Sequence, residues 1–86
     1  MDAKEIKTCL KAAREAIRNK EFKDAAKHCK TVLAADPENY NALVFLGVAA
    51  EGLDQGEQAL KAYKKAAQVQ PDQLLAWQVR LVLKFV

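Results

Sequence analysis

The chain has 86 residues, of which 51% are hydrophobic and 29% are charged, and its formal net charge is +3. This balance excludes a disordered tail and a polybasic arm, because the first contains fewer apolar residues and the second a much denser positive charge. The length allows one small domain that buries only about 60–65% of the surface of its unfolded chain, so regular packing or a partner must add stability.

The N-terminal residues mix both signs of charge and lack the apolar core of a secretion signal. The longest apolar run, residues 42–50, is much too short to span a bilayer. We therefore expect a soluble cytoplasmic protein, with the nucleus as a further location, and no membrane contact. Cys9 and Cys29 lie within apolar helical stripes, so buried reduced thiols are expected, with a disulfide or a metal site as the weaker alternative.

The spacing of apolar residues predicts helices along the whole chain, and no segment shows the alternation of a strand. In chain order, the expected helices are residues 2–18, 22–35, 40–53, 55–69 and 73–84. Asp54 and Glu57 match a capping box, in which the two side chains accept hydrogen bonds from unpaired backbone N–H groups at the start of a helix. This pair is expected to begin the fourth helix.

The chain contains an internal repeat. Two proline-centred segments, at Pro37 and Pro71, lie 34 residues apart, and the same offset relates Ala25 to Ala59. A proline cannot continue a helix interior and also restrains the residue before it, so each unit ends at its proline. The sequence predicts a single domain, residues 1–86, with one repeat at 6–39, a second at 40–73 and a partial third at 74–86.

The second unit resembles the tetratricopeptide repeat family, in which Leu-Gly in the first helix is followed by alanine, an aromatic residue, a second alanine and a closing proline. The first unit matches less well, at Ala25, Val32 and Pro37, and the third has Trp77 at an expected bulky position. The residues that carry the match, and that should pack between helices, are Ala25 and Pro37 of the first unit, Leu43, Leu46, Gly47, Ala59, Tyr63, Ala66 and Pro71 of the second, and Trp77 of the third. The resemblance implies an all-α, right-handed superhelix of antiparallel helix hairpins, with five helices in about two and a half repeats, that binds other proteins.

Within that family, the chain is similar to the N-terminal ends of the long scaffold subunits of superkiller complexes. The segments that carry this similarity are residues 4–8, 16–23, 28–33 and 71–78. The similarity implies a place in a cytoplasmic assembly whose scaffold holds an RNA helicase and a propeller subunit. These proteins pass messenger RNA to the exosome for 3′ to 5′ decay. Residues 79–86 depart from the pattern, because they do not continue as another repeat would.

No residue pattern points to catalysis, a cofactor or a metal. The chain has one histidine, His28, and lacks a glycine-rich phosphate loop, a Cys-x-x-Cys pair and a His-Glu-x-x-His motif. We expect His28 to be exposed and structurally neutral, and carboxylates such as Glu21 and Asp24 to interact with helix dipoles. The sequence therefore predicts a protein that is not an enzyme and that has no catalytic, cofactor-binding or metal-binding residues.

Basic residues form a stripe on the first expected helix. They are spaced by three and four positions and so share one face: Lys4, Lys7, Lys11, Arg14 and Arg18. The family resemblance places part of this stripe in a concave peptide-binding groove, beside an apolar patch of the second repeat. A ligand with acidic and apolar groups would suit such a surface. The candidate groove residues are Lys7, Leu10, Arg14, Arg18, Val44, Phe45 and Val48.

Three alternatives remain open. The basic stripe is also explained as a solvated helix face, and the apolar patch as packing between neighbouring first helices. Direct RNA binding by the stripe is the rival function, although a single-strand binder interleaves aromatic residues for base stacking and none accompanies these five residues. The apolar C-terminal segment, residues 81–86, lacks a hairpin partner and would also suit a homodimer or a self-associating structural fragment.

Overall fold

The computed structural model describes residues 2–70, which form four α-helices and no strand. These are α1 (Ala3–Arg18), α2 (Phe22–Ala35), α3 (Tyr40–Gly52) and α4 (Gly56–Val69). Every helix end lies within one residue of its predicted position, and the all-α fold class is confirmed. The structure describes four helices where the sequence predicted five, because the fifth, at residues 73–84, lies outside the described residues together with Pro71 and Trp77.

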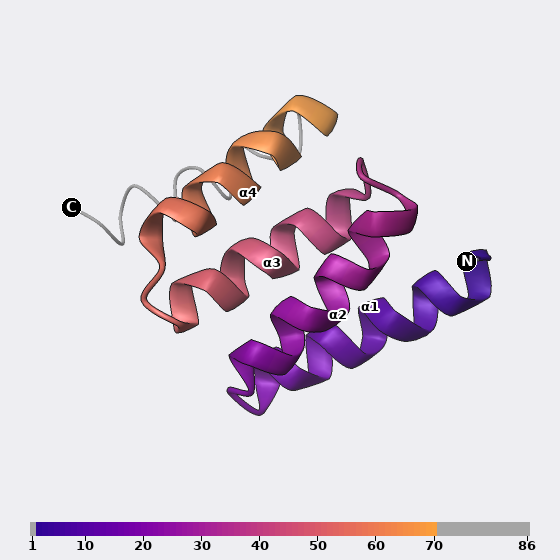
Figure 1. Ribbon diagram of the computed structural model, residues 1–86, viewed down its shortest axis with the longest axis horizontal. Helices are drawn as coiled ribbons and strands as arrows, with labels where there is room; N and C mark the ends of the chain where they lie inside the picture. Colours follow the sequence, from indigo (N-terminus) through magenta and orange to yellow (C-terminus); the bar gives the residue numbers. More distant parts are fainter. Residues whose placement is uncertain (1, 71–86) are drawn as a thin grey trace.

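Consecutive helices pair into two hairpins, α1 with α2 and α3 with α4 (Figure 1). The helix α3 also packs against α2 and α1, so it contacts all three other described helices. By contrast, the backbones of α2 and α4 do not come close to each other, although both helices pack against α3. A gap therefore separates the second helices of the two hairpins, and α3 lies beneath it.

The core between the helices consists mainly of alanine side chains. Its buried hydrophobic residues are Ala13, Ala16, Ala25, Cys29, Val32, Ala42, Leu43, Val44, Ala49, Ala50, Ala59, Ala62, Tyr63 and Ala66. Small side chains allow the helices to approach closely. In the contact between α3 and α4, the Tyr63 ring lies so near Gly47 that a Cβ at Gly47 would be 2.7 Å from the ring atom Cε1.

The first helix of each hairpin begins with a side-chain cap. Asp2 accepts a hydrogen bond from the Glu5 N–H at 2.9 Å at the start of α1, and Asn39 accepts one from the Ala42 N–H at 2.9 Å at the start of α3. Each cap satisfies one of the N–H groups that the first turn of a helix leaves unpaired. The second helices, α2 and α4, have no side-chain cap of this kind.

The turns within the two hairpins share one geometry. Lys20 and Asp54 occupy equivalent positions, 34 residues apart, with φ angles of 61° and 60°. The next residue in each turn donates its backbone N–H to the carbonyl oxygen five positions earlier. Glu21 donates to Ala16 at 2.7 Å, and Gln55 donates to Ala50 at 2.8 Å. This arrangement is a Schellman motif, which normally has glycine at the left-handed position. The 34-residue repeat therefore extends to the backbone conformation of the turns.

The capping box expected at Asp54 and Glu57 is wrong. The helix α4 begins at Gly56, its N-cap residue is Gln55, and no side chain hydrogen-bonds to that cap. Asp54 instead donates its backbone N–H to the Glu51 carbonyl at 3.0 Å. Its left-handed backbone thus completes the end of α3 and places its side chain outside the first turn of α4.

Candidate partner-binding groove

A cleft of about 470 Å³ lies between α1 and α3. Its lining residues come from both first helices and are Lys7, Leu10, Lys11, Arg14, Asn41 and Phe45. We call this cleft the α1–α3 groove. Leu10 and Phe45 are partly buried, whereas the basic side chains are exposed. The groove thus combines an apolar interior with a positively charged rim.

The helical period explains why these residues meet. On α1, positions 7, 10, 11 and 14 recur every three or four residues and share one face, while the buried Ala13 and Ala16 face the other helices. On α3, Asn41 and Phe45 are one turn apart and face α1. The side-chain cap from Asp2 fixes where α1 begins. Lys7, the first basic residue of the groove, therefore lies in the second turn of the helix.

Three positive charges and no carboxylate line the α1–α3 groove. Charge-assisted hydrogen bonds from lysine and arginine to a carboxylate are about twice as strong as neutral ones, so a ligand carboxylate fits this rim. The apolar interior would receive an aliphatic or aromatic side chain of the same ligand. The site is therefore suited to hold a ligand that carries both acidic and apolar groups.

The structure brings together four of the seven residues predicted for the groove: Lys7, Leu10, Arg14 and Phe45. Arg18 is exposed in the last turn of α1 and does not line the cleft. Val48 is partly buried and packs against the core around Leu43 and Tyr63. Only the central part of the basic stripe therefore borders the apolar interior of the groove. This part consists of Lys7, Lys11 and Arg14.

The assignment of Val44 to the groove is wrong. Its side chain is only 4% exposed and belongs to the buried cluster between α3 and α4. Successive helical residues differ by about 100° in direction, so Val44 faces α4 while its neighbour Phe45 faces α1. For Val44, the alternative of packing between helices is the correct one.

Two groove residues were missing from the sequence prediction, Lys11 and Asn41. Lys11 belongs to the same three-and-four spacing as Lys7 and Arg14, and that spacing was the signal for it. Asn41 precedes Phe45 by one helical turn, so its position follows once the orientation of α3 is known. The sequence alone does not give this orientation.

The residues of the repeat signature occupy different environments. Ala25, Ala59 and Ala66 are fully buried, and Leu43, Tyr63 and Gly47 are also buried, whereas Leu46 is only partly buried. Pro37 is exposed in the turn between α2 and α3, so the expectation that it packs between helices is wrong. Its ring ends the first hairpin by preventing continuation of α2, a role that needs no burial.

The two cysteines are free and differ in environment. Cys29 is completely buried, and desolvation by burial raises the pKa of its thiol from 9.0 to about 12. It is therefore a neutral core residue without nucleophilic character at physiological pH. Cys9 is partly buried. His28 is partly buried rather than exposed as expected.

Residues 2–70 contain no group of three or more His, Cys, Asp or Glu side chains that could hold a metal ion. Within the same range, none of the helices combines the length and the apolar character needed to cross a membrane.

The pattern of tetratricopeptide repeats matches residues 16–81, which include the end of α1 and the whole of α2, α3 and α4. The chain belongs to the tetratricopeptide repeat family. No solved structure matches the chain.

The chain is also similar to superkiller proteins of several organisms. It is 67% identical over 78 residues to Superkiller complex protein 3 of Homo sapiens, an alignment that covers 91% of this chain and 5% of that protein. It is 42% identical over 72 residues to Superkiller protein 3 of Schizosaccharomyces pombe (84% of this chain, 5% of that protein) and 35% identical over 82 residues to Superkiller protein 3 of Saccharomyces cerevisiae (85% and 6%). These matches confirm the similarity expected from the sequence. The chain spans only about one twentieth of the length of these relatives.

Proposed function

We propose that this chain is a non-catalytic docking module whose α1–α3 groove holds an acidic and apolar segment of another protein. The observation that carries the proposal is the composition of the groove: Lys7, Lys11 and Arg14 surround the partly buried Leu10 and Phe45, and no carboxylate lines the cleft. Membership in the tetratricopeptide repeat family supports the coarser statement that the chain is a protein-interaction scaffold.

The finer part of the proposal concerns the assembly. Similarity to proteins named Superkiller complex protein 3 supports a place in a superkiller-type scaffold, with a helicase and a propeller subunit as partners and a link to exosome-dependent messenger RNA decay. On the same ground we propose a cytoplasmic location, with the nucleus as a second one. The homodimer through residues 81–86 concerns a segment outside the described residues.

Direct RNA binding at this groove is not favoured. Binding of single-stranded RNA relies on aromatic faces on which bases stack. Phe45 is the one aromatic residue among the lining residues of the described cleft, and it is partly buried between α1 and α3. A carboxylate-bearing peptide uses both the charged rim and the apolar interior, whereas RNA would use the rim alone.

The test is affinity capture by the full 86-residue chain from nuclease-treated cytosolic extract, with quantification of superkiller subunits by mass spectrometry. The test variant is Lys7→Glu with Arg14→Glu, which replaces two positive charges of the α1–α3 groove with negative ones. The matched control is Lys4→Glu with Arg18→Glu, which changes the net charge equally on the same helix but outside the cleft. In the control, one substitution gains and the other loses a favourable interaction with the helix dipole.

We expect capture of the helicase or the propeller subunit to fall about tenfold in the groove variant, equivalent to about 1.4 kcal/mol, and to stay near the wild-type level in the control. Equal losses in both variants would show that only net charge matters. A parallel capture by the wild-type chain uses untreated extract. Partners recovered there but absent after nuclease treatment would assign the interaction to RNA.

A further inference from the structure

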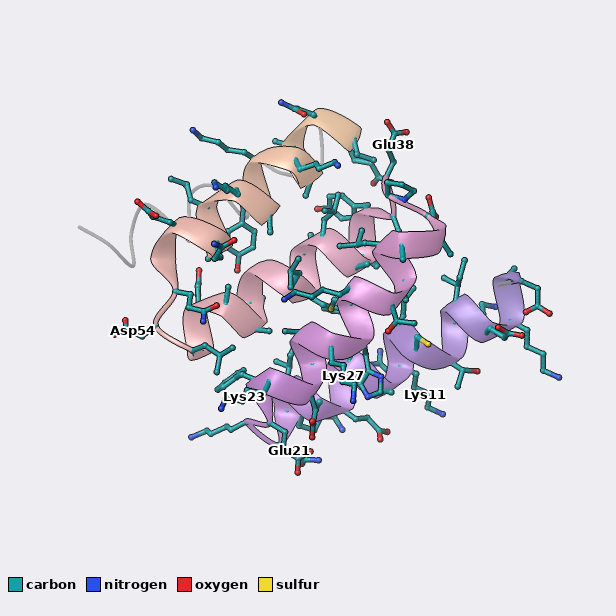
Figure 2. The ribbon with its side chains drawn as sticks, viewed as in Figure 1. Lys11, Glu21, Lys23, Lys27, Glu38 and Asp54 are labelled. Carbon is teal, nitrogen blue, oxygen red and sulfur yellow. The ribbon has the colours of Figure 1, made fainter. Side chains whose placement is uncertain are left out.

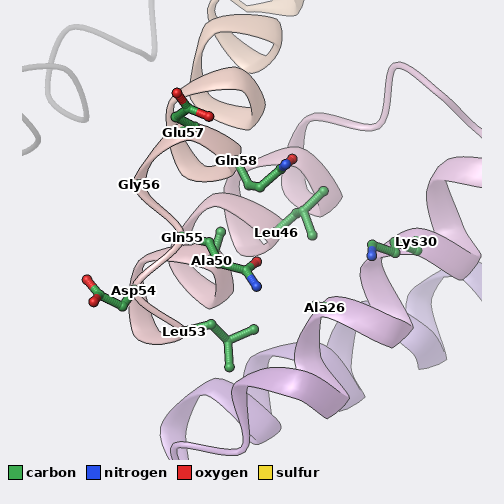
Figure 3. A pocket seen from close by; sticks show the side chains of 10 residues that line it. All are labelled: Ala26, Lys30, Leu46, Ala50, Leu53, Asp54, Gln55, Gly56, Glu57 and Gln58. Carbon is green, nitrogen blue, oxygen red and sulfur yellow. The ribbon is translucent and has the colours of Figure 1, made fainter.

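A second groove lies on the other side of α3, in the gap between α2 and α4. It consists of three cavities of about 590, 290 and 660 Å³. The first and second share Leu46 and Gln58, and the first and third share Ala26, Lys30 and Leu53, so the three are continuous. We call this continuous surface the α2–α4 groove, and Figure 3 shows its central part.

The floor of the α2–α4 groove is apolar and comes from α3 and the turn that follows it. Leu46, Ala50 and Leu53 line the central cavity, and Figure 3 shows the two leucine side chains in the gap between α2 and α4. Both leucines are partly buried, so the floor remains accessible. At about 100° per residue, this face of α3 points away from the face of Asn41 and Phe45. The second groove is therefore separate from the α1–α3 groove.

The walls of the α2–α4 groove are basic. Five exposed lysines line it: Lys23, Lys27 and Lys30 from α2, and Lys61 and Lys65 from α4. Figure 2 shows Lys23 and Lys27 projecting from α2, and Figure 3 shows the Lys30 ammonium directed into the gap.

Only two carboxylates line the same cavities, Asp54 and Glu57. Both line the central cavity beside the α3–α4 turn, and in Figure 3 both side chains point away from the gap. They therefore do not neutralise the lysines along its length. The groove presents a positive potential to a ligand that enters it.

The lining residues follow a helical spacing on both walls. On α2, positions 23, 26, 27, 30, 31 and 33 line the groove, and on α4 positions 56, 57, 58, 61, 62 and 65 do so. Lysines thus alternate with small or apolar residues on two parallel sides of a leucine-rich floor. An amphipathic helix docks into such a groove with its apolar stripe toward the floor and its polar flanks toward the walls.

We propose that the α2–α4 groove binds an acidic amphipathic helix of a partner protein. Its apolar side chains would contact Leu46 and Leu53, and its glutamate or aspartate side chains would pair with Lys30 and Lys61. Charge complementarity with the five lysines selects an acidic partner, and the apolar floor selects a protein segment over nucleic acid. No aromatic residue lines the described cavities, so they offer no platform for base stacking. This site goes beyond the proposed function, which uses a different face of α3.

The probe for the test is a fluorescein-labelled synthetic peptide of about 18 residues, or five helical turns, made of glutamate and alanine with leucine at spacings of three and four. Its affinity for the full 86-residue chain is measured by fluorescence anisotropy. The groove variant is Lys30→Glu with Lys61→Glu, and the matched control is Lys4→Glu with Arg18→Glu, which changes the net charge equally but outside both grooves. All four side chains are exposed, and circular dichroism checks the fold of each variant.

We expect the peptide to bind about tenfold more weakly to the groove variant and within about twofold of wild type to the control. Amide chemical shifts in the bound wild-type chain should change at Ala26, Leu46 and Ala62. A peptide with serine in place of leucine should lose most of its affinity. If the charge-reversed variant unfolds, Lys30→Gln with Lys61→Gln replaces it, with the same expected direction.

Three outcomes would overturn the proposal. Equal weakening in the groove variant and in the control would show a non-specific attraction to positive charge. Shift changes confined to Leu10, Phe45 and their neighbours would place the peptide in the α1–α3 groove. Tighter binding of an oligouridylate than of the peptide, lost in the Lys30→Glu and Lys61→Glu variant, would make the groove a nucleic-acid site.

Discussion

At the scale of single residues, the two hairpin turns show how one backbone position limits stability. Lys20 and Asp54 have positive φ angles, a conformation that costs an L-residue about 1–2 kcal/mol and glycine almost nothing. The hydrogen bonds of the Schellman motif hold both residues in it. A glycine at either position would retain those bonds without the steric cost.

We predict that Lys20→Gly stabilises the chain by about 0.5–1 kcal/mol, because the relief of strain exceeds the entropy that glycine adds to the unfolded state. Urea unfolding followed by circular dichroism measures the change in midpoint. The matched control is Lys27→Gly, an equally exposed lysine inside α2, which should destabilise by about 1 kcal/mol because glycine is a poor helix former. Loss of stability in both variants would show that Lys20 is not strained.

The residue scale also shows where sequence interpretation succeeds and fails. The basic face of α1 was predictable because that helix alternates charged and apolar residues at the helical period. In α3, residues 42–50 are all apolar, since this helix is covered on several sides, and no periodic signal separates Val44 from Phe45. Asp54 was misassigned because its spacing to Glu57 fits a capping box. In the structure its backbone N–H instead donates to a carbonyl at the end of α3, and no sequence pattern indicates this role.

At the scale of helices, the contact between α3 and α4 depends on the missing side chain at Gly47. The Tyr63 ring is 6% exposed and lies within 3 Å of the place where a Cβ would stand. Because the ring is enclosed by the core, it cannot move aside without disturbing other contacts. Gly47 is therefore required by packing, although glycine is unfavourable inside a helix.

We predict that Gly47→Ala destabilises the chain by up to about 2 kcal/mol, since an overpacking cost of about 1–3 kcal/mol exceeds the gain of about 1 kcal/mol in helix propensity. The matched control is Gly56→Ala in the first turn of α4, where a Cβ would meet no atom within 4 Å. This control should be neutral or stabilising by up to about 1 kcal/mol. Chemical denaturation of both variants decides the question, and a stabilised Gly47→Ala protein would contradict the packing argument.

At the scale of the whole molecule, α3 is the structural centre of the described chain. It contacts α1, α2 and α4, and two different faces of it line the α1–α3 and α2–α4 grooves. The helix arrangement was predictable from the 34-residue repeat and the prolines. The grooves were not, because they depend on which faces of α3 remain uncovered after the second helices pack on it.

This arrangement predicts the order of local stability. Repeat proteins are held together by contacts between neighbouring units, so a helix with more neighbours opens only with a larger loss of contacts. Opening α3 separates it from all three other described helices, whereas opening α1 breaks contacts with α2 and α3 alone. Amide hydrogen exchange followed by NMR should therefore show the slowest exchange at the centre of α3 and faster exchange in α1. Equal protection of α1 and α3 would mean that the two hairpins open as one cooperative unit, so that the number of neighbours does not set local stability.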